Sequence, residues 1–281
     1  MKEFNLTIPG LTIACKSWGS PESPPVLALH GWLDNANTFD KLAPFLEKKF
    51  YLIAVDLPGH GMSSHLAEGC HYHFIDGIFA VVNIINALGF EKIHLLGHSM
   101  GACLASLAGG VAADKILSLS LIEGLGPFTS SPDTANIQLS DYIKHQILTD
   151  KKPVRGYKSV EKAAEARAKR GHVSIEAARI LCKRGIKKEN HLYYWQHDRR
   201  LLIPSPLRMT EEQVLSCLKA IIVKTCLIWA SEGYSFNLET METRMKVVKQ
   251  LQTHQLKGGH HIHMEKPQGV AKRLLSFYQN L

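Results

Sequence analysis

The chain has 281 residues, of which 45% are hydrophobic and 21% charged, a composition that predicts a folded core and excludes disordered or collagen-like proteins. It contains no uncharged apolar run of membrane-spanning length and no signal-like N-terminal segment, so we expect a cytoplasmic protein without a membrane span. The six cysteines stand singly, as is typical of reduced thiols, and the formal net charge of +8 raises the question of an anionic partner.

Short apolar runs alternate with helix-length amphipathic stretches, a pattern that predicts an α/β fold with a mostly parallel sheet between helices. The opening residues, with Pro9 and Gly10 between two apolar stretches, predict an antiparallel hairpin at the sheet edge. Strands are predicted at residues 11–17, 26–29, 52–56, 93–97, 116–123, 221–229 and 253–256, and helices at residues 38–46, 74–88, 99–109, 238–250 and 267–279.

Residues 129–216, called the inserted segment below, depart from this alternation. They lack convincing strand runs and contain alanine-rich and lysine-rich helical pieces at 159–170 and 175–184. Residues 144–219 hold 18 Lys or Arg and 8 Asp or Glu, whereas the rest of the chain holds 15 and 17. We therefore predict a basic helical insertion within a core domain made of residues 1–128 and 217–281.

The motif Gly97-His98-Ser99-Met100-Gly101 carries the strongest chemical signal. It follows a predicted strand and precedes a helix-forming run, the context in which G-x-S-x-G holds a nucleophilic serine at the carboxyl edge of a sheet. The two glycines allow a tight turn, and the following helix presents free backbone N–H groups to a developing oxyanion. The alternative is a serine in an ordinary turn between a strand and a helix.

Together with this motif, two further segments resemble the α/β-hydrolase superfamily. The residues His30-Gly31-Trp32 are similar to its H-G-x loop, which implies the backbone N–H groups of Trp32 and Met100 as oxyanion-hole donors. Residues 56–63 (DLPGHGMS) are similar to its D-x-x-G-x-G-x-S loop, interpreted as scaffold. The resemblance implies an eight-stranded sheet, with the inserted segment as a cap after the sixth strand. The strings HGWLDNA at 30–36 and EGLGP at 123–127 are most similar to the serine hydrolase-like proteins.

A histidine-rich segment near the C-terminus supplies the base that a serine nucleophile needs. Residues 258–267 (GGHHIHMEKP) are similar to the superfamily's G-G-H-x-x-H-x-E-x-P segment, which implies His260 as general base. His261 and His263 are interpreted as loop-packing residues. A zinc site in this cluster is the rival interpretation, but the sequence offers no matching second cluster, so we expect neither a metal nor a cofactor.

The position of the acid that would complete a Ser-His-acid triad departs in this chain from the usual pattern of the superfamily. The usual place lies after the strand predicted at 221–229, where this chain has Glu232 and then Gly233 at the aspartate's position. Glu232 is therefore offset by one residue. The favoured candidate is Glu123, at the end of the strand predicted at 116–123, because some members of the superfamily carry their acid there. A glutamate that ends a buried strand also needs a partner.

These residues predict a serine hydrolase that cleaves carboxylic esters of small molecules through an acyl-enzyme. Thioester, lactone or carbon–carbon bond hydrolysis are alternatives, and a ligand-binding protein on the same fold is the non-enzyme alternative. Candidate pocket residues are His30, Gly31, His98 and Phe128.

The aromatic and charged run at residues 193–201 is interpreted as docking the cap onto the core rather than lining an acyl pocket. We expect a monomer or homodimer. No nucleic-acid partner is expected, because the cations of the inserted segment are interspersed with Ala and Glu. Steering of an anionic substrate by the cap stays an open alternative to a solvated basic surface.

Overall fold

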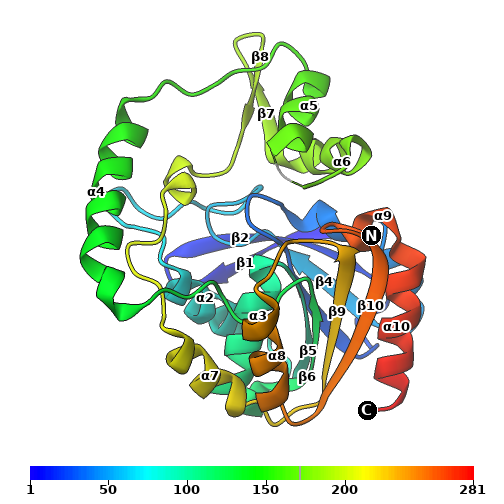
Figure 1. Ribbon diagram of the computed structural model, residues 1–281. Helices are drawn as coiled ribbons and strands as arrows, with labels where there is room; N and C mark the ends of the chain where they lie inside the picture. Colours follow the sequence, from blue (N-terminus) through cyan, green and yellow to red (C-terminus); the bar gives the residue numbers. More distant parts are fainter. Residues whose placement is uncertain (171) are drawn as a thin grey trace.

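The computed structural model describes residues 1–170 and 172–281, and its centre is an eight-stranded sheet between two layers of helices (Figure 1). The strands of this sheet are β1 (Lys2–Ile8), β2 (Leu11–Trp18), β3 (Pro25–Leu29), β4 (Tyr51–Val55), β5 (Ile93–His98), β6 (Ile116–Ile122), β9 (Thr225–Glu232) and β10 (Leu251–Gly259). They lie in the order β1-β2-β4-β3-β5-β6-β9-β10. β1 and β2 form the predicted antiparallel hairpin, β2 pairs antiparallel with β4, and all other neighbours are parallel.

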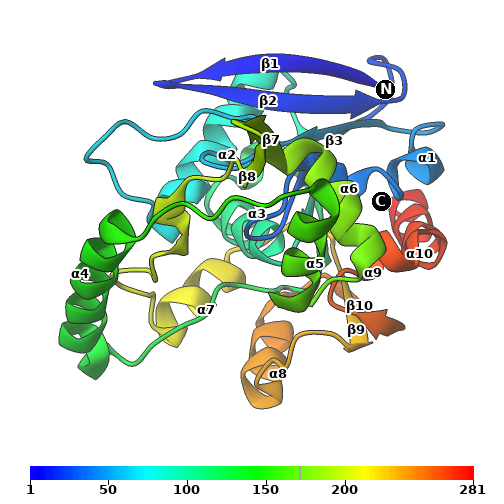
Figure 2. The ribbon, with the colours of Figure 1, turned by 90° about the horizontal axis from the view of Figure 1, so that it is seen from above.

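Helices cover both faces of the sheet, as the alternation of the sequence predicts. They are α1 (Ala43–Leu46), α2 (Phe74–Leu88), α3 (Met100–Val111), α8 (Leu238–Val247), α9 (Ile262–Glu265) and α10 (Pro267–Gln279). Figure 2 shows α1 and α10 on one side of the sheet and α2 and α3 on the other. Each face has its own apolar cluster, one containing Val81 and Leu104 and the other Phe39 and Phe277.

Most of the predicted elements begin and end within three residues of the predicted bounds, and two differ more. The helix predicted at 38–46 is divided into a 3-10 turn at Ala36–Phe39 and the single turn α1. Pro44 explains the division, because proline has no N–H to continue a helix from the preceding turn. The strand predicted from residue 221 begins at Thr225, since the Ile221 amide instead donates to the Leu218 carbonyl at a helix end.

The inserted segment lies between β6 and β9 in the chain. It contains α4 (Ala135–Lys151), α5 (Val160–Arg170), α6 (Ile175–Gly185), the start of α7 (Glu211–Lys219), and a hairpin of β7 (Ile186–Glu189) and β8 (Leu192–Trp195). α5 and α6 match the predicted helical pieces and lie above the carboxyl edge of the sheet (Figure 1). The boundary predicted between residues 216 and 217 falls within α7, where the Cys217 carbonyl lies against Gly110 of α3.

The β7–β8 hairpin corrects the expectation that the inserted segment has no strands. Its turn residues, Asn190 and His191, have φ values of 44° and 66°, the left-handed conformation that a two-residue hairpin turn requires. The sequence concealed β7 because its last three residues, Lys187, Lys188 and Glu189, are charged and exposed. A strand with exposed side chains on both of its faces does not show the apolar alternation by which strands are recognised.

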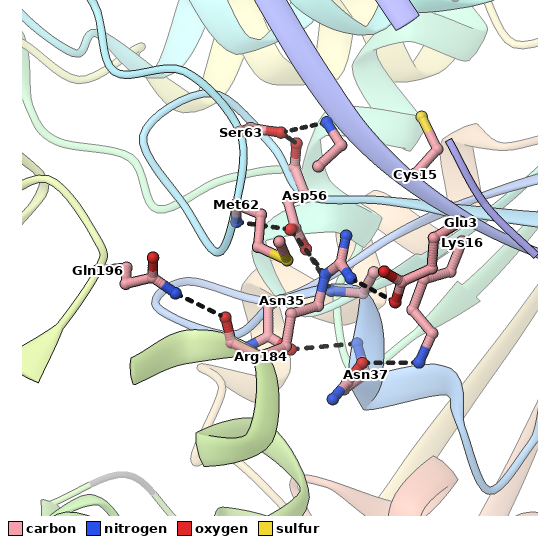
Figure 3. A network of polar contacts seen from close by, with 12 residues as sticks. Glu3, Cys15, Lys16, Asn35, Asn37, Asp56, Met62, Ser63, Arg184 and Gln196 are labelled. Carbon is pink, nitrogen blue, oxygen red and sulfur yellow. Dashed lines mark hydrogen bonds and ion pairs between the residues drawn. The ribbon is translucent and has the colours of Figure 1, made fainter. Parts of the chain in front are cut away.

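A buried ion pair connects the inserted segment to the core (Figure 3). Arg184 of α6 donates from Nε to Oδ2 of Asp56 at 2.8 Å, and from Nη1 to Oε1 of Glu3 at 2.9 Å. Asp56 follows β4, is fully buried, and also accepts from the amides of Ala36 and Met62. The residues 56–63 interpreted as scaffold therefore also hold α6 in place.

We predict that Asp56→Asn lowers the free energy of unfolding by about 3–5 kcal/mol, because it leaves the Arg184 guanidinium buried beside a neutral group. Urea denaturation followed by circular dichroism measures the loss. The control is Glu165→Gln, which breaks the exposed pair with Lys162 and is expected to cost far less, because solvent screens exposed charges. Equal losses in the two variants would contradict a structural role for the buried pair.

Candidate active site

Ser99 occupies the sharp turn between β5 and α3. Its φ of 52° and ψ of −116° are rarely adopted by a residue with a side chain, and such backbone strain gathers at functional sites. The turn requires glycine on both sides. A Cβ on Gly97 would lie 2.4 Å from the Gly101 carbonyl oxygen, and a Cβ on Gly101 would lie 2.1 Å from that of Leu29.

The structure brings Ser99, His260 and Glu123 together in one hydrogen-bonded chain. His260 Nε2 lies 2.9 Å from Ser99 Oγ, and His260 Nδ1 lies 2.9 Å from Glu123 Oε2. A carboxylate only accepts, so Nδ1 carries the proton and Nε2 is free to accept from the serine hydroxyl. The side chain of His260 is 11% exposed and that of Glu123 is 1% exposed.

Glu123, rather than Glu232, lies beside the histidine. Glu123 directly follows β6 and has a φ of 57°, and its carboxylate accepts from the backbone amides of Ala230 at 2.5 Å and Tyr234 at 3.1 Å. Glu232 is the last residue of β9 and is exposed, and it makes no side-chain hydrogen bond within the described residues. The end of β9, at Ala230, and the residues just after it, at Tyr234, therefore contribute amides to the site.

The predicted oxyanion-hole residues lie at the same edge of the sheet. β3 and β5 are parallel neighbours, with Leu29 opposite Gly97, so the loop containing Trp32 lies beside the turn at Ser99. Met100 is the first residue of α3, and the first amides of a helix have no acceptor within it. The Trp32 indole donates to the carbonyl of Leu201 at 3.0 Å, which joins this loop to the inserted segment.

Two of the candidate pocket residues have buried side chains. His30 accepts from the Leu57 amide at 2.9 Å and donates to the Gly31 carbonyl, while His98 donates from Nε2 to the His260 carbonyl at 2.9 Å. Neither imidazole has exposed surface, and burial lowers the pKa of both. This corrects the expectation that His30 and His98 line a substrate pocket, because they support the loops instead. Phe128 is 57% exposed.

A buried charged cluster of Asp34, Arg167 and His261 was missed by reasoning from the sequence, where Asp34 was only part of the HGWLDNA string. Asp34 accepts from Arg167 at 2.7 Å and from His261 Nε2 at 2.9 Å. His261 Nδ1 lies 3.1 Å from the carbonyl of His172. Both ring nitrogens of His261 thus face oxygen acceptors, an arrangement that favours the doubly protonated imidazolium.

Opposing effects set the pKa values of Asp34 and His261. Burial alone lowers the pKa of His261, but the Asp34 charge and the hydrogen bonds to Asp34 and His172 outweigh it, so the pKa lies above 6.5. Burial alone raises the pKa of Asp34, but His261 and Arg167 hold it well below 3.8. The ion pair between Asp34 and His261 therefore persists to a higher pH than the ordinary pKa of histidine and to a lower pH than that of aspartate would allow.

Asp34, His98 and His261 are also the residues that could hold a metal ion, since their ligand atoms lie within 4.8 Å of one another. His98 Nδ1 has no hydrogen-bond partner among the described residues and lies 3.7 Å from Asp34 Oδ2. However, Asp34 already pairs with the cation Arg167 and with His261 in a geometry that favours imidazolium. A bound metal would require His261 to lose a proton and its contact with Asp34. The donor set therefore fits an ion-pair cluster better than a metal site.

We predict that the stability difference between the wild type and His261→Gln decreases as pH rises. A histidine with a raised folded-state pKa stabilises fully below its unfolded pKa, and this contribution is lost as pH rises through the folded pKa. The difference is therefore largest near pH 5 to 6.5 and smaller at about pH 8 to 9.

Urea denaturation across this pH range measures the effect, with His145→Gln at an exposed site of α4 as the control for loss of an imidazole. A wild-type minus His261→Gln difference that stays constant with pH would contradict the assignment of a charged His261.

The chain resembles known hydrolases over nearly its whole length. A family model of the alpha/beta hydrolase fold matches residues 24–145. A serine hydrolase-like protein of Mus musculus is 30% identical over 99% of this chain and 96% of its own length. Another, of Dictyostelium discoideum, is 32% identical over 95% of this chain and 79% of its own.

Solved structures share the fold closely. A hypothetical protein from Pseudomonas aeruginosa PAO1 superimposes with a TM-score of 0.93 at 36% identity, covering 99% of this chain and 100% of that one. The thioesterase domain from the curacin biosynthetic pathway has a TM-score of 0.85 at 29% identity, with coverage of 98% and 99%. Together these similarities support a hydrolase.

Proposed function

The chain belongs to the α/β-hydrolase superfamily, in the branch of the serine hydrolase-like proteins, and on that premise we propose that it cleaves carboxylic esters or related acyl bonds through an acyl-enzyme. The observation that carries the proposal is the hydrogen-bonded chain from Ser99 through His260 to Glu123. A serine alcohol is a weak nucleophile at neutral pH, and this arrangement supplies the base that activates it.

In the proposed reaction, His260 Nε2 takes the proton of Ser99 as Oγ attacks the substrate carbonyl. Glu123 keeps the other ring nitrogen protonated and stabilises the imidazolium that forms. The backbone N–H groups of Trp32 and Met100 donate to the oxyanion. His260 then protonates the leaving alcohol, and in the second half-reaction it deprotonates the water that hydrolyses the acyl-enzyme and returns the proton to Ser99.

Exposed aromatic side chains near the site favour a substrate with apolar groups. Trp32, Phe128 and Tyr234 are 51%, 57% and 40% exposed. The Phe128 and Tyr234 rings lie 5.5 Å apart, and the Tyr234 ring lies 5.8 Å from that of His260. We propose that the inserted segment acts as the cap that completes this region, since its Leu201 carbonyl accepts a hydrogen bond from the Trp32 indole.

Acyl thioesters are the second candidate substrate class. The observation that favours them is the full-length similarity to a thioesterase domain at 29% identity. The acyl-enzyme would be the same, and only the leaving group would change from an alcohol to a thiol. Lactones and carbon–carbon bonds stay as further alternatives.

We predict that a fluorophosphonate probe labels the wild type at Ser99 and that the protein hydrolyses short-chain p-nitrophenyl esters. Ser99→Ala and His260→Ala should each lower kcat by several orders of magnitude, because the triad acts as a unit. Mass spectrometry of the labelled peptide identifies the site. A wild-type protein that is folded, unlabelled and inactive on esters and thioesters would rule out the proposed function.

We also predict that Glu123→Gln lowers kcat about 10²- to 10⁴-fold, since an amide cannot stabilise the imidazolium and favours the wrong tautomer. Glu232→Gln should change kcat less than about twofold, because the Glu232 side chain is exposed and makes no hydrogen bond to His260. Steady-state kinetics of both variants on one ester makes the comparison. Equal, mild effects would show that neither glutamate is the acid.

A further inference from the structure

His98 precedes Ser99 in the chain, and its imidazole is bonded to the loop after β10. His98 Nε2 donates to the backbone carbonyl of His260 at 2.9 Å, and the His98 side chain is fully buried. Burial lowers the pKa of this imidazole, so the ring is neutral. Because a carbonyl only accepts, Nε2 carries the proton of the ring and Nδ1 carries a lone pair. The residue before Ser99 is thus hydrogen-bonded to the main chain of His260.

Two hydrogen bonds and one peptide bond close a ring around Ser99 and His260. Ser99 Oγ lies 2.9 Å from His260 Nε2, the His260 carbonyl accepts from His98, and His98 is covalently bonded to Ser99. A shift of the loop after β10 away from Ser99 must therefore break one of the two hydrogen bonds or move the turn that carries Ser99. The contact with His98 restrains the main chain from which the His260 imidazole extends.

The Nδ1 edge of the His98 ring faces the loop after β3. Nδ1 lies 3.7 Å from Asp34 Oδ2 and has no hydrogen-bond partner among the described residues. A Cβ built on Gly31 would lie 3.0 Å from the same nitrogen, closer than the optimum for non-bonded atoms. The ring therefore fills the space between the loop that carries Trp32 and the loop that carries His260.

We propose that His98 is a positioning residue, which sets the spacing between Ser99 and His260 through the hydrogen bond from its Nε2 to the His260 carbonyl. The inference rests on the proposed function, because it takes Ser99 as the nucleophile and His260 as the base. A general base must lie within hydrogen-bond reach of the proton that it takes, so loss of this bond lowers turnover by misplacing the imidazole. The requirement at position 98 is a donor at the place of Nε2 rather than an imidazole as such.

The experiment compares His98→Phe with His98→Gln by steady-state kinetics on a p-nitrophenyl ester. Phenylalanine keeps a ring but has no donor, whereas the amide of glutamine offers an N–H at the position of Nε2 and an acceptor beside it. His98→Phe should lower kcat about 10- to 100-fold with little change in KM, because a fully buried side chain does not bind substrate. His98→Gln should keep kcat within about fivefold of the wild type.

His94 offers a matched control near the opposite end of β5. It is also a buried histidine, and its Nδ1 lies 2.8 Å from Ser118 Oγ. His94→Phe removes a buried imidazole hydrogen bond, so it should destabilise the protein about as much as His98→Phe while leaving kcat unchanged. Urea denaturation measures the two stabilities. Equal losses of kcat in the two phenylalanine variants would overturn the proposal, because general destabilisation would then account for both.

The remaining outcomes test the donor itself. A folded His98→Phe with the kcat of the wild type would overturn the proposal, and so would a His98→Gln variant as slow as His98→Phe. If His98→Phe does not fold, His98→Asn takes its place, since it carries the same amide on a side chain one carbon shorter that does not reach the carbonyl. His98→Asn should be about tenfold or more slower than His98→Gln. Equal kcat values in these two amide variants would overturn the proposal.

A second readout does not depend on turnover. The His260 Nδ1 proton that bonds to Glu123 should give a downfield proton NMR signal in the wild type, in His98→Gln and in His94→Phe, and His98→Phe should lose or shift it. If wild type shows neither probe labelling nor ester hydrolysis, the proposed function has failed, while this signal still decides whether His98 positions His260. A signal unchanged in His98→Phe, or nitrogen NMR that shows the His98 proton on Nδ1, would overturn the inference by itself.

Discussion

The hydrogen bond between Glu123 and His260 Nδ1 is the contact on which the site depends. It joins the ends of two strands that are not neighbours, β6 and β10. The strand between them, β9, and the residues just after it supply the amides that hold the carboxylate. Ser99 follows β5, on the other side of β6. Because these strands are parallel, their carboxyl ends meet at one edge, and the ladder fixes the three side chains relative to one another. The relative positions of Ser99, Glu123 and His260 therefore follow from the order of the strands in the sheet.

Buried charges position the loops that surround this edge. Asp34 lies in the loop after β3 and pairs with His261, the residue next to His260, and with Arg167 of the inserted segment. Asp56 follows β4 and pairs with Arg184 of the same segment. A buried pair of this kind adds little to stability when compared with apolar packing, but it is costly to break. These pairs therefore join the loops after β3, β4 and β10 to one another and to the inserted segment.

Local patterns predicted much of the fold and of the candidate site. Helices α2 and α10 have the predicted bounds, because their apolar spacing and end residues are local signals. The segments containing Ser99 and His260 could also be recognised from local signals, since glycines lie close to both residues in the sequence. Glu123 was favoured over Glu232 because some members of the superfamily carry their acid there and a glutamate that ends a buried strand needs a partner. Local pattern alone does not decide between them, because the answer depends on which side chain crosses from one strand to the next. The closeness of Gly233 to Glu123, where a Cβ on the glycine would lie 2.2 Å from Oε2, is equally invisible until β6 and β9 are placed side by side.

Contacts within the protein account for part of the positive charge of the inserted segment. Arg167 pairs with the buried Asp34 at 2.7 Å, and Arg184 pairs with the buried Asp56 at 2.8 Å. Arg200 pairs with Asp198 and donates to backbone carbonyls. This agrees with the interpretation of residues 193–201 as docking the segment onto the core. The cations that remain exposed are the lysines at positions 144, 151, 152, 158, 162, 169, 183, 187 and 188 and the arginines at positions 155, 170, 179 and 208. Such charges act over about 8 Å at physiological ionic strength, so their reach to an anionic substrate is short unless salt is low. Arg167, Arg184 and Arg200 thus dock the segment onto the core, whereas its exposed lysines and exposed arginines form a solvated surface.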